Sequence, residues 1–102
     1  MAAEANLVRQ IKRYLAGVAK ETPVFLAKNH GNQYVRAGLP DMIMVVCGVV
    51  VFLECKAPGK RPTRIQMHVI EQIRAAGGIA EVVESVDDVR RIVLGILRTG
   101  CR

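Results

Sequence analysis

The chain has 102 residues, 51% of them hydrophobic, and a formal net charge of +6. This length supports one domain with a single core, and the hydrophobic content excludes an intrinsically disordered chain. No apolar stretch approaches the roughly 20 residues of a membrane-spanning helix. The N-terminal segment carries recurring charges rather than the apolar run of a signal peptide, so we expect a cytoplasmic protein.

Charge and aromatic content indicate the class of partner. The sequence pI of about 9.7 indicates a polyanionic partner, with nucleic acid preferred over a membrane surface. The chain has no Trp, two Tyr and two Phe, so phosphate contacts on duplex or branched DNA are favoured over base stacking on single strands.

The three cysteines Cys47, Cys55 and Cys101 are odd in number and lack CxxC spacing. That pattern argues against a disulfide framework and a zinc site, and it suits a reducing compartment.

Hydrophobic periodicity predicts a helix over about residues 3–19, followed by a group of strands. The buried stripe of this helix comprises Leu7, Val8, Ile11, Tyr14, Leu15 and Val18. A short strand is expected at 23–28, and a loop or brief strand around 34–36. Two strands rich in Val and Ile follow at 42–46 and 49–56, joined by a tight turn at Cys47 and Gly48.

Capping signals predict the second half of the chain. Thr63 is placed to cap a helix that runs to about residue 76 and ends at Gly77 and Gly78. A last strand is expected at 79–84, and Ser85 with Asp88 forms a capping box for a final helix. The order α-β-β-β-α-β-α predicts an α/β fold with a mixed sheet flanked by helices, because the last strand joins the sheet through a helical crossover.

Three charged residues flank the apolar hairpin at 42–56. Asp41 opens its first strand, while Glu54 and Lys56 share a face at the end of its second strand and Cys55 points to the core. A tight turn would bring Asp41 and Glu54 to the same end of the ladder. Two adjacent carboxylates repel unless a cation lies between them, and their oxygens suit Mg²⁺ or Mn²⁺. With a neighbouring lysine, this set is typical of a phosphodiesterase site; the pair Glu54 and Lys56 alone is equally consistent with a strand end that reaches solvent.

Other polar residues have a structural alternative beside the functional one. Glu4 shares the buried edge of the first helix, yet a first-turn acid is also stabilised by the helix dipole. Gln66 faces inward on its helix, yet Thr63 and Gln66 have the spacing of a capping box. The basic run Lys56, Lys60, Arg61 and Arg64 adjoins the acidic pair, which favours phosphate binding over a merely solvated face.

The residues Gly38-Leu39-Pro40-Asp41, then Glu54-Cys55-Lys56, then Gln66 resemble the motifs of the PD-(D/E)xK nuclease superfamily, which has a restriction-endonuclease-like core. More closely, the pattern is similar to the stand-alone VRR-NUC (virus-type replication-repair nuclease) domains of phages and bacteria. The resemblance extends from Glu4 to about Leu97 and so implies a single domain over residues 1–102.

This resemblance implies an endodeoxyribonuclease that depends on Mg²⁺ or Mn²⁺. Asp41, Glu54 and the backbone carbonyl of Cys55 would bind the metal, and Lys56 would position the attacking water. Gln66 and Glu4 would complete the site, with Gln66 catalytic and Glu4 a further metal ligand. The expected DNA contacts are Lys28, Arg36, Lys60, Arg61 and Arg64.

The resemblance also implies a homodimer that acts on four-way junctions or other branched DNA, in replication, recombination or repair, inside a bacterial or phage-infected cell. Two alternatives remain open at this point. One is a non-catalytic basic DNA-binding module, and the other is a restriction-type nuclease that cleaves duplex DNA. The second alternative would normally need additional recognition elements, for which the chain leaves little room.

Overall fold

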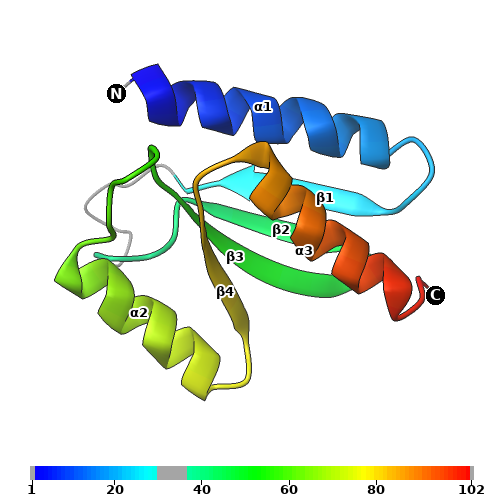
Figure 1. Cartoon of the computed structure of the whole chain (residues 1–102). Coiled ribbons are helices and arrows are strands. Elements are labelled where there is room, and N and C mark those ends of the chain that lie inside the picture. The colour runs from blue at the N-terminus through cyan, green and yellow to red at the C-terminus, as the bar shows by residue number, and fades with distance from the viewer. Residues whose placement is uncertain (1, 30–36, 102) are drawn as a thin grey trace.

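The computed structural model describes residues 2–29 and 37–101, and its elements follow the predicted order (Figure 1). The expected DNA contact Arg36 and the brief strand considered around residues 34–36 lie outside the described residues. The elements are α1 (Ala2–Val18), β1 (Val24–Lys28), β2 (Met42–Val46), β3 (Val49–Cys55), α2 (Arg64–Ala75), β4 (Ile79–Val83) and α3 (Val86–Arg98).

The four strands form one mixed sheet in the order β1-β2-β3-β4, antiparallel except for the parallel pair β3 and β4. Cys47 and Gly48 have φ values of 50° and 82°, the left-handed conformation that a type I′ hairpin turn requires at both central positions. This turn sets the register in which Met42 pairs with Leu53. Asp41 and Glu54 therefore lie across from one another, one step beyond that pair.

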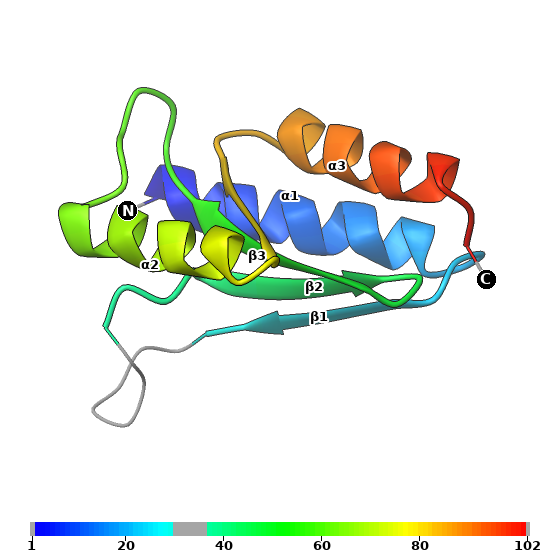
Figure 2. The ribbon, with the colours of Figure 1, turned by 90° about the horizontal axis from the view of Figure 1, so that it is seen from below.

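The main core lies between the sheet and the two helices α1 and α3 (Figure 2). Helix α2 contacts β4, and its buried residues Val69 and Ile70 lie outside this main cluster. The predicted mixed sheet flanked by helices is confirmed. The most deeply buried side chains of the main core are Ile11, Leu15, Met42, Met44, Val46, Val51, Leu53, Cys55, Val83, Val89 and Val93.

The helix caps differ slightly from the prediction. The Oγ1 of Thr63 accepts a hydrogen bond from the backbone N–H of Gln66 at 3.2 Å, and the Oε1 of Gln66 accepts one from the N–H of Thr63 at 2.8 Å. This is the predicted capping box of α2. At α3, the Oγ of the N-cap residue Ser85 accepts a hydrogen bond from the backbone N–H of Asp88, as expected. The carboxylate of Asp88, however, accepts from the N–H of Glu84, one residue before the N-cap.

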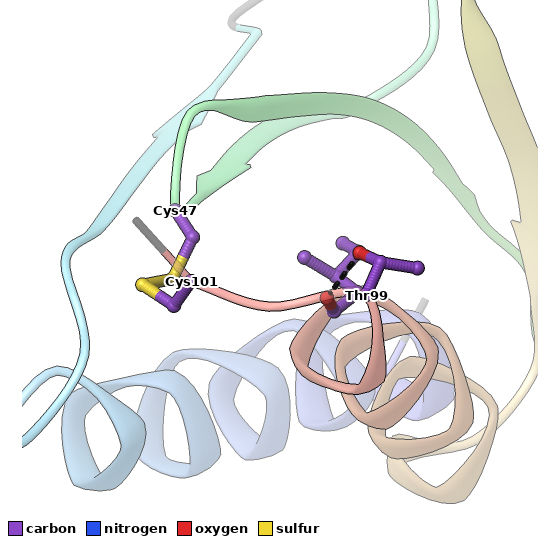
Figure 3. The surroundings of a disulfide bond; sticks show 4 residues. Cys47, Thr99 and Cys101 are labelled. Atoms are coloured by element: carbon purple, nitrogen blue, oxygen red, sulfur yellow. Dashed lines mark hydrogen bonds between the residues drawn. A yellow bond between two sulfur atoms is a disulfide. The ribbon is translucent and has the colours of Figure 1, made fainter.

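The expectation that the cysteines form no disulfide is wrong for two of them. Cys47 and Cys101 are joined by a disulfide that ties the chain after α3 to the β2–β3 turn (Figure 3). They are 54 residues apart in sequence, and only the folded arrangement of the hairpin and α3 brings their Cα atoms to 5.2 Å. Sequence spacing carries no signal for such a pairing. Cys55 is a free, buried cysteine.

None of the helices in the described part of the chain has the length and apolar character that crossing a membrane requires.

Candidate active site

The candidate site lies at the end of the β2–β3 hairpin opposite to its turn. Oδ2 of Asp41 accepts a hydrogen bond from the backbone N–H of Cys55 at 2.9 Å. The backbone carbonyl of Asp41 also accepts from the N–H of Asn29 at 2.6 Å, which extends the pairing of β1 with β2. Asp41 is thus held by its main chain on one side and by its side chain on the other.

Glu54 is a charged side chain inside the protein. Its relative exposure is 1%, and neither of its carboxylate oxygens has a hydrogen-bond partner within residues 2–29 and 37–101. Burial, and then the negative charge of Asp41, raise the pKa of Glu54 to about 7. Burying a charged carboxylate that lacks hydrogen bonds is unfavourable, so a nearby cation would stabilise the ionised form of Glu54.

Lys56 supplies part of the positive charge that stabilises the carboxylate of Glu54. Its Nζ lies 3.5 Å from Oε2 of Glu54, and its side chain is only 13% exposed. The ammonium group opposes the rise in the pKa of Glu54 but does not cancel it. With both carboxyl groups ionised, Asp41, Glu54 and Lys56 together carry a net negative charge, which attracts a further cation.

A cleft of about 220 Å³ opens between the N-terminal part of α1 and this end of the sheet. Glu4, which is half-buried, and Asp41 both line it. Lys28 contributes a cation from the end of β1. Glu54 does not line the cleft, since its carboxylate is buried beside Asp41. The lining residues are Glu4, Ala5, Val8, Lys28, Asp41 and Cys55.

Cys55 takes part in the candidate site through its backbone rather than through its thiol. Burial is the main cause that raises the pKa of this thiol to about 12, so the thiolate is strongly disfavoured. The sulfur faces the core, 3.7 Å from the sulfur of Met42. The side chain at the middle of the Glu-x-Lys motif is therefore a packing residue, as expected.

Gln66 is occupied by its structural role. Its side-chain oxygen bonds to Thr63, and no hydrogen bond joins it to Asp41 or Glu54 in the described part of the chain. Lys60, Arg61 and Arg64 are exposed, in the loop from β3 to α2 and in the first turn of α2. That loop and the N-terminal end of α1 lie at the same end of the sheet (Figure 1).

Two solved structures share this arrangement of helices and strands. One, described as a VRR-NUC domain, has a TM-score of 0.74 and 22% identity, and the match covers 89% of this chain and 94% of that chain. The other, described as a VRR-NUC domain protein, has a TM-score of 0.67 and 19% identity over 90% of this chain and 88% of that chain. The chain has the fold of a VRR-NUC domain.

Part of the sequence is also similar to a phage protein. A segment of 53 residues is 38% identical to a protein of Acyrthosiphon pisum secondary endosymbiont phage 1 that bears the name "Putative nuclease p44". The match covers 51% of this chain and 57% of that protein, so the chain spans little more than half the length of its curated relative. No family model matches the sequence.

The residues at this end of the VRR-NUC fold suit a divalent cation. Within the described ranges, no group of three His, Cys, Asp or Glu side chains is placed to hold a metal by itself. Two carboxylates lie together here, and one of them has no hydrogen-bond partner in the described part of the chain. Such a pair suits Mg²⁺, which retains several waters and takes one or two protein carboxylates. Asp41, Glu54 and the carbonyl of Cys55 are the groups that would hold it.

Sequence reasoning missed one contact of the basic turn that follows β3. Oε2 of Glu84, just after β4, accepts a hydrogen bond from the backbone N–H of Gly59 at 3.0 Å. The N–H of Lys60 also donates to the carbonyl of Ala57 at 3.0 Å, which closes the turn. These bonds fix the basic turn beside the end of β4. The only sequence signal was a carboxylate at a strand end, which has many ordinary explanations.

Proposed function

We propose that this protein is an endodeoxyribonuclease that uses Mg²⁺ or Mn²⁺ to hydrolyse DNA phosphodiester bonds. The observation that carries the proposal is the buried carboxylate of Glu54, which has no hydrogen-bond partner among the described residues and lies beside Asp41 and Lys56. The VRR-NUC fold and the phage relative named as a nuclease support the same chemistry. The net charge of +6 is consistent with a DNA substrate.

The proposed roles follow from the contacts of each side chain. A divalent cation at this site would supply charge neutralisation and a water of lowered pKa. Asp41, fixed by the N–H of Cys55, and Glu54 provide the carboxylates that hold the cation. Lys56 orients the attacking water and offsets the negative charge that builds up on the phosphate. Glu4 faces the same cleft and would bind the cation through water or as a further ligand.

Gln66 has a less direct part in this proposal. Its side chain closes the capping box of α2, so it fixes the start of the helix that follows the basic turn. We propose that it acts on the reaction by positioning that turn. Lys60, Arg61 and Arg64, which are exposed there, and Lys28 in the cleft would bind the phosphates of the DNA backbone.

The proposed substrate is a four-way junction or another branched DNA, cleaved by a homodimer. One cleft of this size serves one strand, so two symmetric incisions require two copies. An apolar strip on the sheet offers a surface for the second copy. Phe25 pairs with Val45, which pairs with Val50, so these side chains share one face; Phe25 is 61% exposed and Val50 45%.

The direct test is a cleavage assay on a panel of labelled substrates: a four-way junction, a flap, a linear duplex and a single strand. Each is incubated with Mg²⁺, with Mn²⁺ or with EDTA. We expect metal-dependent incision of the junction in preference to the duplex, and no incision with EDTA. Cleavage of linear duplex at a defined sequence would identify a restriction-type enzyme instead. Binding without incision under any metal would identify a DNA-binding module.

Analytical ultracentrifugation of the wild-type protein and of Phe25→Ser tests the homodimer. The proposal expects a dimer that dissociates in the variant while the circular dichroism spectrum is retained. A wild-type protein that is monomeric at micromolar concentration, yet cuts both strands of a junction in one binding event, would contradict it.

A further inference from the structure

Helix α1 carries a row of cations on its outer side. Arg9, Lys12 and Arg13 are exposed and fall within an arc of about 100° around the helix axis. The buried stripe, centred on Ile11, lies on the opposite side of the same helix. The charges of this row therefore face solvent rather than the core.

The charges of this row are not neutralised. In the part of the chain that the structure describes, no carboxylate forms an ion pair with Lys12 or Arg13, and Arg9 bonds to the neutral side chain of Asn6. The adjacent helix α3 is different. There Arg90 pairs with Asp87 and Arg91 pairs with Asp88, so equivalent cations are compensated on their own helix.

The row begins where the cleft ends. Val8 lines the cleft that contains Asp41, and Arg9 is the next residue. Farther along α1, a second hollow of about 190 Å³ lies between α1 and β1, and Lys12 lines it together with Leu15 and Leu26. Positive charge therefore extends along α1 from the part of the helix that lines the cleft.

We propose that the outer face of α1 binds the phosphate backbone of duplex DNA that flanks the scissile phosphate. This rests on the proposed nuclease function and extends it to a surface separate from the basic turn. Lys12 and Arg13 lie about 12 to 14 Å along the helix from Glu4. If the duplex runs along α1, that distance corresponds to phosphates about four base pairs from the cut.

The test compares two double variants of equal charge. Lys12→Gln with Arg13→Gln removes two uncompensated cations, and Arg90→Gln with Arg91→Gln removes two cations that are paired with carboxylates; each lowers the net charge by two. Binding of a four-way junction with long arms is measured in EDTA as a function of salt concentration. Circular dichroism and thermal unfolding confirm that each variant is folded.

The α1 variant should bind roughly thirtyfold more weakly at 0.15 M salt, and the slope of log K against log salt should fall by about two. The α3 variant should keep the wild-type slope. Equal losses in both variants would show that only net charge matters, and an unchanged slope in the α1 variant would show a solvated face; either result overturns the proposal.

A second measurement locates the contact on the DNA. Methylphosphonates replace the charged phosphates about four base pairs from the mapped cut. They should weaken DNA binding by the wild-type protein but hardly change binding by the α1 variant. In that variant the cations that would contact these phosphates are already absent. Equal weakening of both proteins contradicts the contact. Metal-dependent cleavage by the wild-type protein tests the nuclease function separately, so the two failures are distinguishable.

Discussion

A single hydrogen bond joins Asp41 to Cys55, from the backbone N–H of Cys55 to Oδ2 of Asp41 at 2.9 Å. Cys55 is flanked by Glu54 and Lys56, so this bond fixes the first carboxylate against the middle of the Glu-x-Lys motif. The type I′ turn and the hairpin register bring the two segments to this distance. The geometry of the site is therefore a consequence of how the hairpin pairs.

Replacement of Asp41 separates its structural role from its proposed catalytic role. Asp41→Asn keeps an oxygen that accepts from Cys55 and removes the charge that repels Glu54, so stability at pH 7 should be retained or increased. Asp41→Ala leaves the N–H of Cys55 without its acceptor, at a cost of about 1–3 kcal/mol. Urea unfolding measures this difference. The cleavage rate of both variants should fall by at least about a hundredfold. An Asp41→Asn protein that still cleaves DNA would contradict the proposed catalytic role of Asp41.

The free energy of unfolding of the metal-free protein should depend on pH through Glu54. Its pKa rises from 4.5 to about 7 on folding, so between these values the folded protein binds a proton that the unfolded chain does not. The contribution of this group to stability is full below pH 4.5 and is lost as pH rises through 7. The shift corresponds to about 3 kcal/mol.

Denaturant unfolding at a series of pH values in EDTA measures this dependence, and Glu54→Gln is the matched control. The variant should lack the decline between pH 4.5 and 7. A divalent cation should reverse the decline in the wild-type protein, because it favours the ionised carboxylate. Identical pH profiles for the wild type and the variant would show that Glu54 titrates normally.

Gly38 holds the segment before Asp41 against α2. Its φ is 86°, and a Cβ at this position would lie 2.8 Å from the carbonyl oxygen of Ile65 and 2.9 Å from Cγ2 of Val69. Gly38→Ala should therefore lower stability by about 1–3 kcal/mol and reduce cleavage, because the Asp41 segment must move. Gly95→Ala is the control: nothing lies within 4 Å of its Cβ, and alanine favours α3. Thermal unfolding should move in opposite directions for the two variants.

Reduction of the Cys47–Cys101 disulfide should lower stability without disabling the site. In the chain-entropy description, a loop of this length contributes about 4 kcal/mol to the free energy of unfolding. The bond lies at the turn of the hairpin, about 20 Å along the strand from Asp41. Unfolding with and without reductant, beside Cys101→Ser, measures the effect. A reduced protein that is folded but no longer cleaves DNA would show that the bond supports the site itself.

Much of the fold was predictable because its local signals agree with one another. The hydrophobic stripe of α1, the turn at Cys47 and Gly48, and the caps at Thr63 and Ser85 each specify an element boundary from nearby residues. Their order then requires a crossover and a mixed sheet. The approach of Asp41 to Glu54 also follows from sequence, since a two-residue turn fixes the register.

The relationships that sequence did not predict are those between distant segments. The disulfide depends on where α3 ends relative to the hairpin turn, and no spacing rule encodes that position. The bond from Gly59 to Glu84 likewise joins the basic turn to the end of another strand. Gln66 showed a different difficulty, because one side chain fits both a capping box and a site, and its observed bonds belong to the cap.

The central claim is that Asp41, Glu54 and Lys56 form a metal-dependent nuclease site. It is tested most directly by single-turnover cleavage of a labelled four-way junction with Mn²⁺, by the wild-type protein and by Glu54→Gln purified in parallel. We predict incision by the wild type that stops with EDTA, and no incision by the variant, although the variant is folded and binds the junction. Equal incision by both proteins would contradict the claim, and so would the absence of incision by the wild type.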